Sequence, residues 1–231
     1  MGRASASRRA HRTARRGPGR PAGRTATDGV IADRDALLEA AERRIRDHGP
    51  VVSLEAIAAE AGVTKPILYR SVGDKDALVL ALAQRLAGRM ADDVARLVAT
   101  ASTPLDGLRS LVGGYLRHAA RDRHLYLYVT AGGASDDRVR QSLLLADDAA
   151  SQFAASIESY RSARGADPTV ATVWAYGMVG ALHFVTLWWL REQAVDVERV
   201  TDQITALMWS GLDLDQEPRP APEPSMRRKP R

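Results

Sequence analysis

The sequence predicts an all-α protein in which a small helix-turn-helix unit precedes a larger helical domain. Apolar residues recur three or four positions apart through most of residues 33–212, which is the spacing of an amphipathic helix. The four prolines of that span stand where such segments begin or end, and a single short run alternates like a strand. With 231 residues, 45% of them hydrophobic, the chain can bury a substantial core.

Three short helices are expected first. An aspartate N-cap and the stop "HGP" place the first at residues 33–47. Ser53 caps the second, "SLEAIAAEA", and Gly62 ends it. Thr64 caps the third, and Pro66 lies in its first turn, where its missing N–H is no loss. Gly62 and Pro66 therefore mark the stop and start of two consecutive helices rather than damage to one long helix.

Longer helices follow. The alternating run at residues 125–129 would be a strand without a partner, so a short helix is favoured there. Capping residues and apolar spacing place the other helices at residues 74–99, 103–120, 136–163, 167–193 and 196–212. The expected domains are an arginine-rich arm (1–30), a helix-turn-helix domain (31–80), a larger helical domain (81–214) and a proline-rich tail (215–231). We expect the arm and the tail to be disordered.

Basic residues concentrate in the arm. Residues 1–24 hold eight of the 33 basic residues and no acidic one, which leaves 25 basic against 28 acidic residues elsewhere. Such a block is typical of a solvated tail, or of an arm that follows phosphates or enters a minor groove, where Arg20 and Arg24 would contact DNA. An organelle transit peptide is also rich in arginine, but Pro18 and Pro21 disfavour the helix that it needs, and an apolar secretory stretch is missing before Leu37.

The composition argues against several classes of protein. A chain without cysteine has neither disulfides nor thiol chemistry, which fits a reducing compartment, so the cytoplasm is expected. The sequence contains neither a "GxSxG" motif nor a glycine-rich phosphate loop, so we expect neither an enzyme nor a cofactor. His118 and His124 do not form a helical i, i+4 pair, and a third ligand is not evident, so a metal is not expected.

The third helix carries the chemistry. Two short helices joined by a turn with glycine form a helix-turn-helix, whose second helix can lie in a DNA major groove, although such units also occur as structural corners. Leu68 is expected to face the core. The other side offers hydroxyl and cationic groups for phosphates and base edges, and an isoleucine for a thymine methyl. These residues are Thr64, Lys65, Ile67, Tyr69 and Arg70.

A family resemblance supports this interpretation. The segment "IAAEAGVTKPILY" fits I-A-x-x-A-G-V-[ST]-x-x-x-L-Y, and "GDKDAL" fits G-[DS]-K-[DE]-x-L. With these motifs, residues 33–82 resemble the N-terminal domain of the tetracycline-repressor (TetR) family of bacterial transcription regulators. The resemblance implies that DNA bases or backbone are contacted by Lys65, Pro66, Ile67 and Arg70. It implies that phosphates are contacted by Thr64, Tyr69 and Lys75. Two positions depart from the family pattern: Ser71 stands where the family often has His or Tyr, and Val72 where it often has Phe. The first departure argues against a phosphate contact at Ser71.

Residues 168–190 contain no charged side chain. This length could span a bilayer, but polar residues are spread along it and a second span is missing, so a membrane helix is not favoured. A helix apolar on nearly all sides is otherwise buried both by its own domain and by a partner. The TetR resemblance implies a homodimer through the last two helices. The expected interface residues are Val179, Leu187, Leu207 and Trp209.

The interior of the larger domain is the expected site for a small apolar ligand. Aromatic and polarisable side chains with a few polar tips suit such a ligand, although single aromatic residues at helical spacing are usually core. The candidate residues are Tyr115, His118, Tyr126, Trp174, Met178, His183 and Phe184. The leading hypothesis is a ligand-responsive repressor that binds double-stranded DNA at a palindrome as a homodimer. The alternative is a ligand-independent architectural DNA-binding protein that relies on the basic arm.

Overall fold

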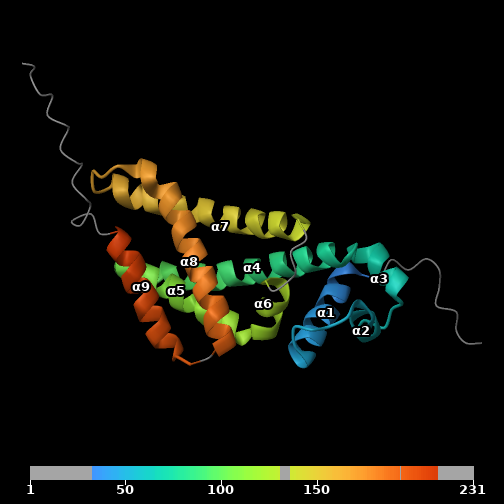
Figure 1. Ribbon diagram of the computed structural model, residues 1–231. Coiled ribbons are helices and arrows are strands. Elements are labelled where there is room, and N and C mark those ends of the chain that lie inside the picture. The colour runs from blue at the N-terminus through green and yellow to red at the C-terminus, as the bar shows by residue number, and fades with distance from the viewer. Residues whose placement is uncertain (1–32, 131–135, 193, 213–231) are drawn as a thin grey trace, which may run out of the picture. The chain divides into compact units, whose positions relative to one another are not determined.

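The structure is a computed structural model that describes residues 33–130, 136–192 and 194–212, apart from the side chains of residues 136–146. Every regular element in this part of the chain is a helix, which confirms the all-α class (Figure 1). The strand alternative for residues 125–129 is wrong, because they lie in a helix. The basic arm with Arg20 and Arg24, and the tail, lie outside the described residues.

The helices begin and end close to the predicted positions. They are α1 (Arg34–His48), α2 (Leu54–Glu60), α3 (Lys65–Val72), α4 (Lys75–Ala99), α5 (Pro104–Arg121), α6 (Arg123–Thr130), α7 (Asp136–Ser162), the 3₁₀ turn η1 (Pro168–Val170), α8 (Ala171–Glu192) and α9 (Val197–Leu212). The predicted caps explain this agreement. Thr103 Oγ1, for example, accepts a hydrogen bond from Asp106 N at 3.1 Å, and Pro104 follows as the first residue of α5.

Helices α1, α2 and α3 pack around a small apolar core. Ile57 of α2 and Leu68 of α3 are both almost fully buried there. Ser53 Oγ accepts a hydrogen bond from Ala56 N at 3.2 Å and so fixes the start of α2. Gly62 has a φ of +67°, a left-handed conformation that lets the chain turn from α2 into α3. The helix-turn-helix predicted from the sequence is therefore present.

Helix α4 belongs to both domains. Asp74 Oδ1 accepts a hydrogen bond from Ala77 N at 2.8 Å, and the helix then runs for 25 residues. Arg85 and Arg89 join it to α1, whereas Asp93, farther along, joins it to α5. The domain boundary expected near residue 80 thus lies inside a continuous helix.

The larger domain consists of α5 to α9 with the second half of α4. Helix α5 packs against both α4 and α9, and α8 packs along α7 (Figure 1). The approach of α4 and α5 is close, since a Cβ atom at Gly114 would lie 2.9 Å from Leu97 Cδ1. Helix α8 buries Ala175, Met178 and Leu182 in this domain but leaves other apolar residues exposed.

Candidate DNA-binding face and its links to the larger domain

Helix α3 has a buried side and an exposed side. Leu68 and Val72 are 1% and 5% exposed, and they anchor the helix to the core. The exposed or half-exposed side chains are Thr64, Lys65, Pro66, Ile67, Tyr69 and Arg70. The fold therefore leaves accessible the N-cap Thr64 and all five α3 residues that were expected at DNA. Ser71 is half-buried between the two sides.

The starts of α3 and α4 are suited to anions. The first N–H groups of a helix lack partners within the helix and carry a positive partial charge. Within the described chain, the hydroxyl of Thr64 makes no capping hydrogen bond to α3, so it can donate to a phosphate. Lys75, the first residue of α4, is exposed. The neighbouring Asp74 carboxylate is used to cap α4.

Lys65 has a partner that sequence reasoning did not identify. Its Nζ forms an ion pair with the Glu55 carboxylate in the first turn of α2, and it lies 5.8 Å from the ring centroid of Tyr69. Lys65 Nζ donates this hydrogen bond to Glu55, which lowers the pKa of Glu55 and raises the pKa of Lys65. The sequence carried no clear signal for this pair, because the turn joins the end of α2 to the start of α3, and only the angle between the two helices brings Glu55 near Lys65.

A buried carboxylate joins α1 to α4. Glu42, 4% exposed, accepts hydrogen bonds at 3.0 Å from Arg46 Nη2 of its own helix and from Arg89 Nη1 of α4. Arg85 Nε lies 3.4 Å from the same carboxylate, and Arg85 Nη1 donates to Asp35 at 2.9 Å. Three guanidinium groups thus neutralise one buried charge, which is how proteins accommodate such a group.

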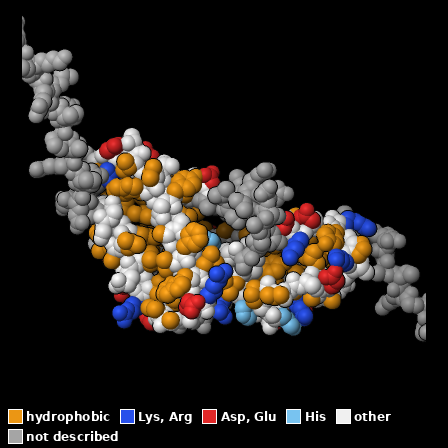
Figure 2. All heavy atoms as spheres, viewed as in Figure 1, with side chains coloured by type: hydrophobic (Ala, Val, Ile, Leu, Met, Phe, Trp, Pro, Cys, Tyr) orange, Lys and Arg blue, Asp and Glu red, His pale blue; other side chains and the backbone are white. Residues whose placement is uncertain are grey.

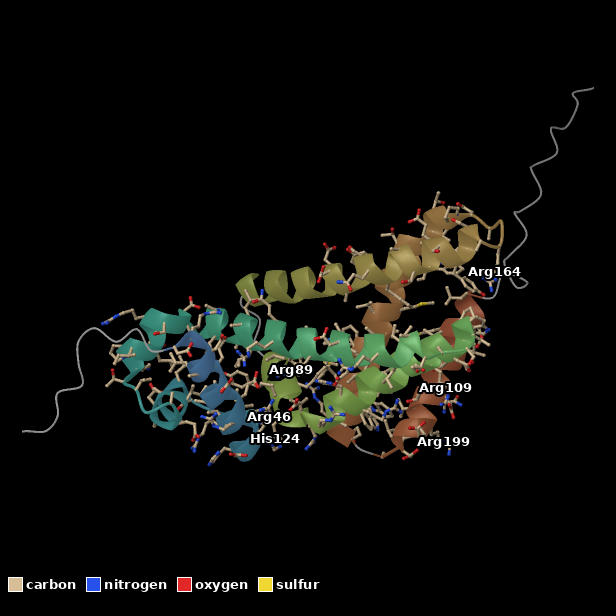
Figure 3. All side chains as sticks on the ribbon, turned by 180° about the vertical axis from the view of Figure 1, so that it is seen from behind. Arg46, Arg89, Arg109, His124, Arg164 and Arg199 are labelled. Atoms are coloured by element: carbon tan, nitrogen blue, oxygen red, sulfur yellow. The ribbon has the colours of Figure 1, made fainter. Side chains whose placement is uncertain are left out.

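A second set of contacts joins α1 to the α5–α6 junction. Arg46 Nε donates to Asp122 Oδ1 at 2.6 Å, and His124 Nδ1 donates to the carbonyl oxygen of Arg46 at 2.8 Å. Figure 3 shows Arg46, Arg89 and His124 close together where α1, α4 and α6 meet. Arg46 also binds Glu42, which in turn binds Arg89 of α4, so the two α1 side chains together connect α1 to α4 and to the α5–α6 junction. Sequence reasoning missed this junction, since its partners are 76 and 78 residues apart.

The larger domain contains a polar chain within its apolar interior. The hydroxyl groups of Tyr115 and Tyr126 lie 2.9 Å apart, and the Tyr126 hydroxyl lies 3.1 Å from His183 Nδ1. The two tyrosine rings meet edge to face. Burial raises the pKa of both tyrosines and lowers the pKa of His183. All three groups are therefore neutral near pH 7.

The other expected pocket residues do not take part in this polar chain. His118 is buried between α4 and α5, where Nδ1 lies 2.9 Å from Asp93 Oδ2, and this hydrogen bond lowers the pKa of Asp93. The guanidinium carbon of Arg161 lies 4.5 Å from the ring centroid of Trp174, and Met178 lies in the core. Phe184 was expected in the interior, but its side chain is 72% exposed because it lies on the outer side of α8.

The outer side of α8 presents an apolar stripe, here called the α8 stripe. It consists of Val173, Gly177, Gly180, Phe184 and Trp188, which are exposed or half-buried and recur at helical spacing. Figure 2 shows hydrophobic side chains gathered on this face of the larger domain. A Cβ atom at either glycine would meet nothing within 4 Å. Leu207 of α9 is likewise exposed.

Three of the four expected interface residues lie partly inside the domain. Val179, Leu187 and Trp209 are half-buried against the core, and Trp209 meets Tyr160 edge to face, with ring centroids 5.9 Å apart. Leu207 is exposed as expected. Sequence reasoning did not single out Val173 and Trp188 as exposed, because a helix that is apolar on nearly all sides does not reveal which side its own domain covers.

Among the described residues, Pro168–Glu192 is the one segment long and apolar enough to cross a bilayer. In this fold one side of it packs against α5, α7 and α9, and its other side is exposed. The described side chains contain no group of three or more His, Asp or Glu residues placed to hold a metal ion.

A helix-turn-helix joined to a larger helical domain defines a transcriptional regulator, and comparisons with known proteins identify its family. Residues 37–82 match the family described as bacterial regulatory proteins, tetR family, and residues 115–223 match the tetracyclin repressor-like C-terminal domain. The chain belongs to the TetR family and is a DNA-binding transcriptional regulator, not an enzyme.

Individual relatives agree. An uncharacterized HTH-type transcriptional regulator of Mycobacterium tuberculosis is 28% identical over 188 residues, which cover 79% of this chain and 78% of that protein. The HTH-type transcriptional activator FasR of Mycolicibacterium smegmatis is 26% identical over 204 residues, which cover 86% of this chain and 92% of FasR. The crystal structure of a TetR-like transcriptional regulator from Rhodococcus sp. RHA1 has a TM-score of 0.57 and 25% identity, covering 77% of this chain and 94% of that one.

Proposed function

We propose that this protein is a ligand-responsive repressor of the bacterial cytoplasm. It binds a palindromic operator as a homodimer and is released by a small apolar molecule. The observation that carries the proposal is the two-sided character of α3, which buries Leu68 and exposes Lys65, Tyr69 and Arg70. These exposed groups provide cations, an aromatic ring and hydrogen-bond donors on a helix that fits the major groove.

The α8 stripe supports a homodimer. Exposed apolar surface on one side of a helix is stabilised when a second helix covers it, and glycines allow the two backbones to approach closely. Gly177 and Gly180 have open space on that side, between Val173 and Phe184. A two-fold dimer presents two copies of α3, which would read two half-sites about one turn of DNA apart.

The chain of Tyr115, Tyr126 and His183 supports a ligand site in the larger domain. Neutral hydroxyl and imidazole groups amid apolar side chains favour an uncharged or weakly polar ligand, held by one or two hydrogen bonds. Met178 and Trp174 would supply apolar contact near α8. A permanently charged ligand is disfavoured, because these groups would not compensate its desolvation.

The junction around Arg46 supports coupling between this site and DNA. It joins the end of α1 to the start of α6, and Glu42 joins the same arginine to α4. A ligand that displaces α6 or the second half of α4 would move these charges together. The spacing of the two α3 helices in the dimer would change as a result. Allostery requires two such states, one favoured by the ligand and the other by DNA.

Selection of bound duplexes from a random pool tests the proposal. The purified protein should enrich a palindrome, and a reporter gene placed behind that palindrome should be repressed. Recovery of an unrelated mixture of duplexes would contradict sequence-specific binding. Light scattering of the complex should show a dimer on each palindrome.

A deletion of residues 1–24 separates this proposal from the architectural alternative. In a ligand-responsive repressor the deletion should preserve the operator preference and reduce the salt dependence, since only phosphate contacts are removed. In an architectural protein that relies on the eight arginines of the arm, all sequence preference should disappear with it.

A further inference from the structure

The exposed side of the helix-turn-helix carries an acid as well as its cations. The Glu55 carboxylate forms an ion pair with Lys65, and the two side chains are 61% and 42% exposed. An ion pair that exposed contributes little to folding, because water and salt screen it. Its place beside the expected DNA contacts instead suggests a role in recognition.

A carboxylate at this position acts against binding to arbitrary DNA. Phosphate attraction is the main source of affinity for non-operator sequences, and each cation that approaches a phosphate adds to it. Glu55 opposes that attraction in two ways, since it neutralises Lys65 and is itself repelled by phosphates. The lowered pKa of Glu55, caused first by the hydrogen bond from Lys65, keeps this carboxylate charged near pH 7.

One base pair complements the ion pair. In the major groove a G·C pair offers the acceptors N7 and O6 of guanine beside the amino donor of cytosine. A lysine suits the acceptors, and a glutamate suits the amino group. Lys65 is the first residue of α3, and the N-terminal residues of a recognition helix contact base edges. The ring of Tyr69, one turn later, lies close to the Lys65 ammonium group.

We propose that Glu55 is a specificity-determining residue, which with Lys65 reads a G·C pair and suppresses binding to other DNA. The inference rests on the proposed approach of α3 to the major groove. The cationic residues nearby are compatible with a role of Glu55 in recognition. Arg70 and Lys75 leave the surface cationic enough to bind an operator despite the added negative charge.

The test compares Glu55→Gln with Glu60→Gln. Both variants remove one negative charge from α2, but Glu60 faces α1, where its Oε1 lies 3.8 Å from Arg43 Nε. The probes are a random-sequence duplex and the palindrome that the wild-type protein selects. At about 0.1 M salt, Glu55→Gln should bind the random duplex roughly five- to tenfold more tightly, with a log–log salt slope steeper by about one, as for one additional phosphate contact.

The ratio of operator to random binding is the decisive quantity. It should fall for Glu55→Gln and remain unchanged for Glu60→Gln, while thermal melting shows that both variants fold. Selection with Glu55→Ala should also lose the G·C preference at one position of each half-site. Equal effects of Glu55→Gln and Glu60→Gln on the two probes would overturn the proposal.

A Lys65→Ala background separates the two parts of the inference. If Glu55 reads bases together with Lys65, adding Glu55→Gln to Lys65→Ala should change the base preference no further. An additional change in preference would show that Glu55 acts without Lys65. If neither Lys65→Ala nor Arg70→Ala affects DNA binding, the proposed role of α3 itself is wrong, and this outcome is distinct from a failure at Glu55 alone.

Discussion

The Nε atom of Arg46, near the end of α1, lies 2.6 Å from Oδ1 of Asp122, the residue between α5 and α6. Burial acts to lower the pKa of Arg46, but the hydrogen bonds and charges of Asp122 and Glu42 outweigh it and raise this pKa. The arginine is therefore charged near pH 7. Arg46 lies in α1 and binds Asp122, so this ion pair joins the helix-turn-helix domain to the larger domain.

Replacement of Glu42 by glutamine should destabilise the protein. Its buried carboxylate accepts charged hydrogen bonds from Arg46 and Arg89, and hydrogen bonds of this kind contribute about 1.5–3 kcal/mol. We expect Glu42→Gln to lower the free energy of unfolding by about 1–3 kcal/mol, measured by urea denaturation. Glu39→Gln is the control, since this α1 carboxylate is exposed and should change stability by less than about 0.5 kcal/mol. Equal losses would show that burial of Glu42 is not important.

Removal of the Asp122 carboxylate should loosen the junction locally. In Asp122→Asn the charge that holds Arg46 is lost, while Glu42 still binds the same guanidinium. Hydrogen exchange should therefore accelerate in the last turn of α1 and in α6, which His124 joins to α1, and remain unchanged in α9. An acceleration spread evenly over all helices would indicate global destabilisation and would contradict a specific link.

Local signals account for what the sequence predicted well. Side-chain caps such as Ser53 and Asp74 fix helix starts through contacts three residues away, and Gly62 marks its own turn through its conformation. Leu68 faces the core together with Val72, which lies one turn later on the same side of α3. These relationships lie within one or two turns of chain, so their pattern is visible in the sequence.

Non-local relationships account for what the sequence did not show. Arg46 and Asp122 are far apart in the chain, and only the packing of α1 against α6 brings them together. Phe184 was expected in the interior because α8 is apolar on nearly every side, so its periodicity could not separate the inner side from the outer one. The ion pair of Glu55 with Lys65 depends on the angle between two helices, which their spacing alone does not define.

A charge on the α8 stripe should prevent dimerisation. Phe184 is 72% exposed near the middle of the stripe, so Phe184→Glu should fold normally but bury an unpaired carboxylate in any dimer. We expect the dimer dissociation constant to rise by roughly tenfold or more, measured by analytical ultracentrifugation. Leu105→Glu is the matched control, because this exposed residue of α5 lies outside the stripe. If the Phe184→Glu and Leu105→Glu variants have the same dimer dissociation constant, the stripe is not the interface.

His183 should make stability depend on pH. Desolvation lowers its pKa in the folded protein from the ordinary value of 6.5, so the unfolded chain binds more protons as the pH falls. The contribution of the neutral imidazole is therefore complete above pH 6.5 and decreases as the pH falls toward the lowered value. Urea denaturation at about pH 8 and about pH 5.5 should show a smaller acid-side loss for His183→Gln than for the wild-type protein. If both proteins lose the same stability between these pH values, groups other than His183 cause the pH dependence.

Two lysines of the DNA-binding face should affect binding in different ways. Lys65 lies at the start of α3 and is expected to reach a base edge, so Lys65→Ala should weaken operator binding by roughly tenfold or more and change the preferred bases. Lys75 lies at the start of α4 and is expected to contact a phosphate, so Lys75→Ala should weaken binding to operator and random duplexes equally and reduce the salt slope by about one. Fluorescence anisotropy titrations of both duplexes at several salt concentrations measure these quantities. If the two variants change affinity, base preference and salt slope alike, then α3 does not read bases through Lys65.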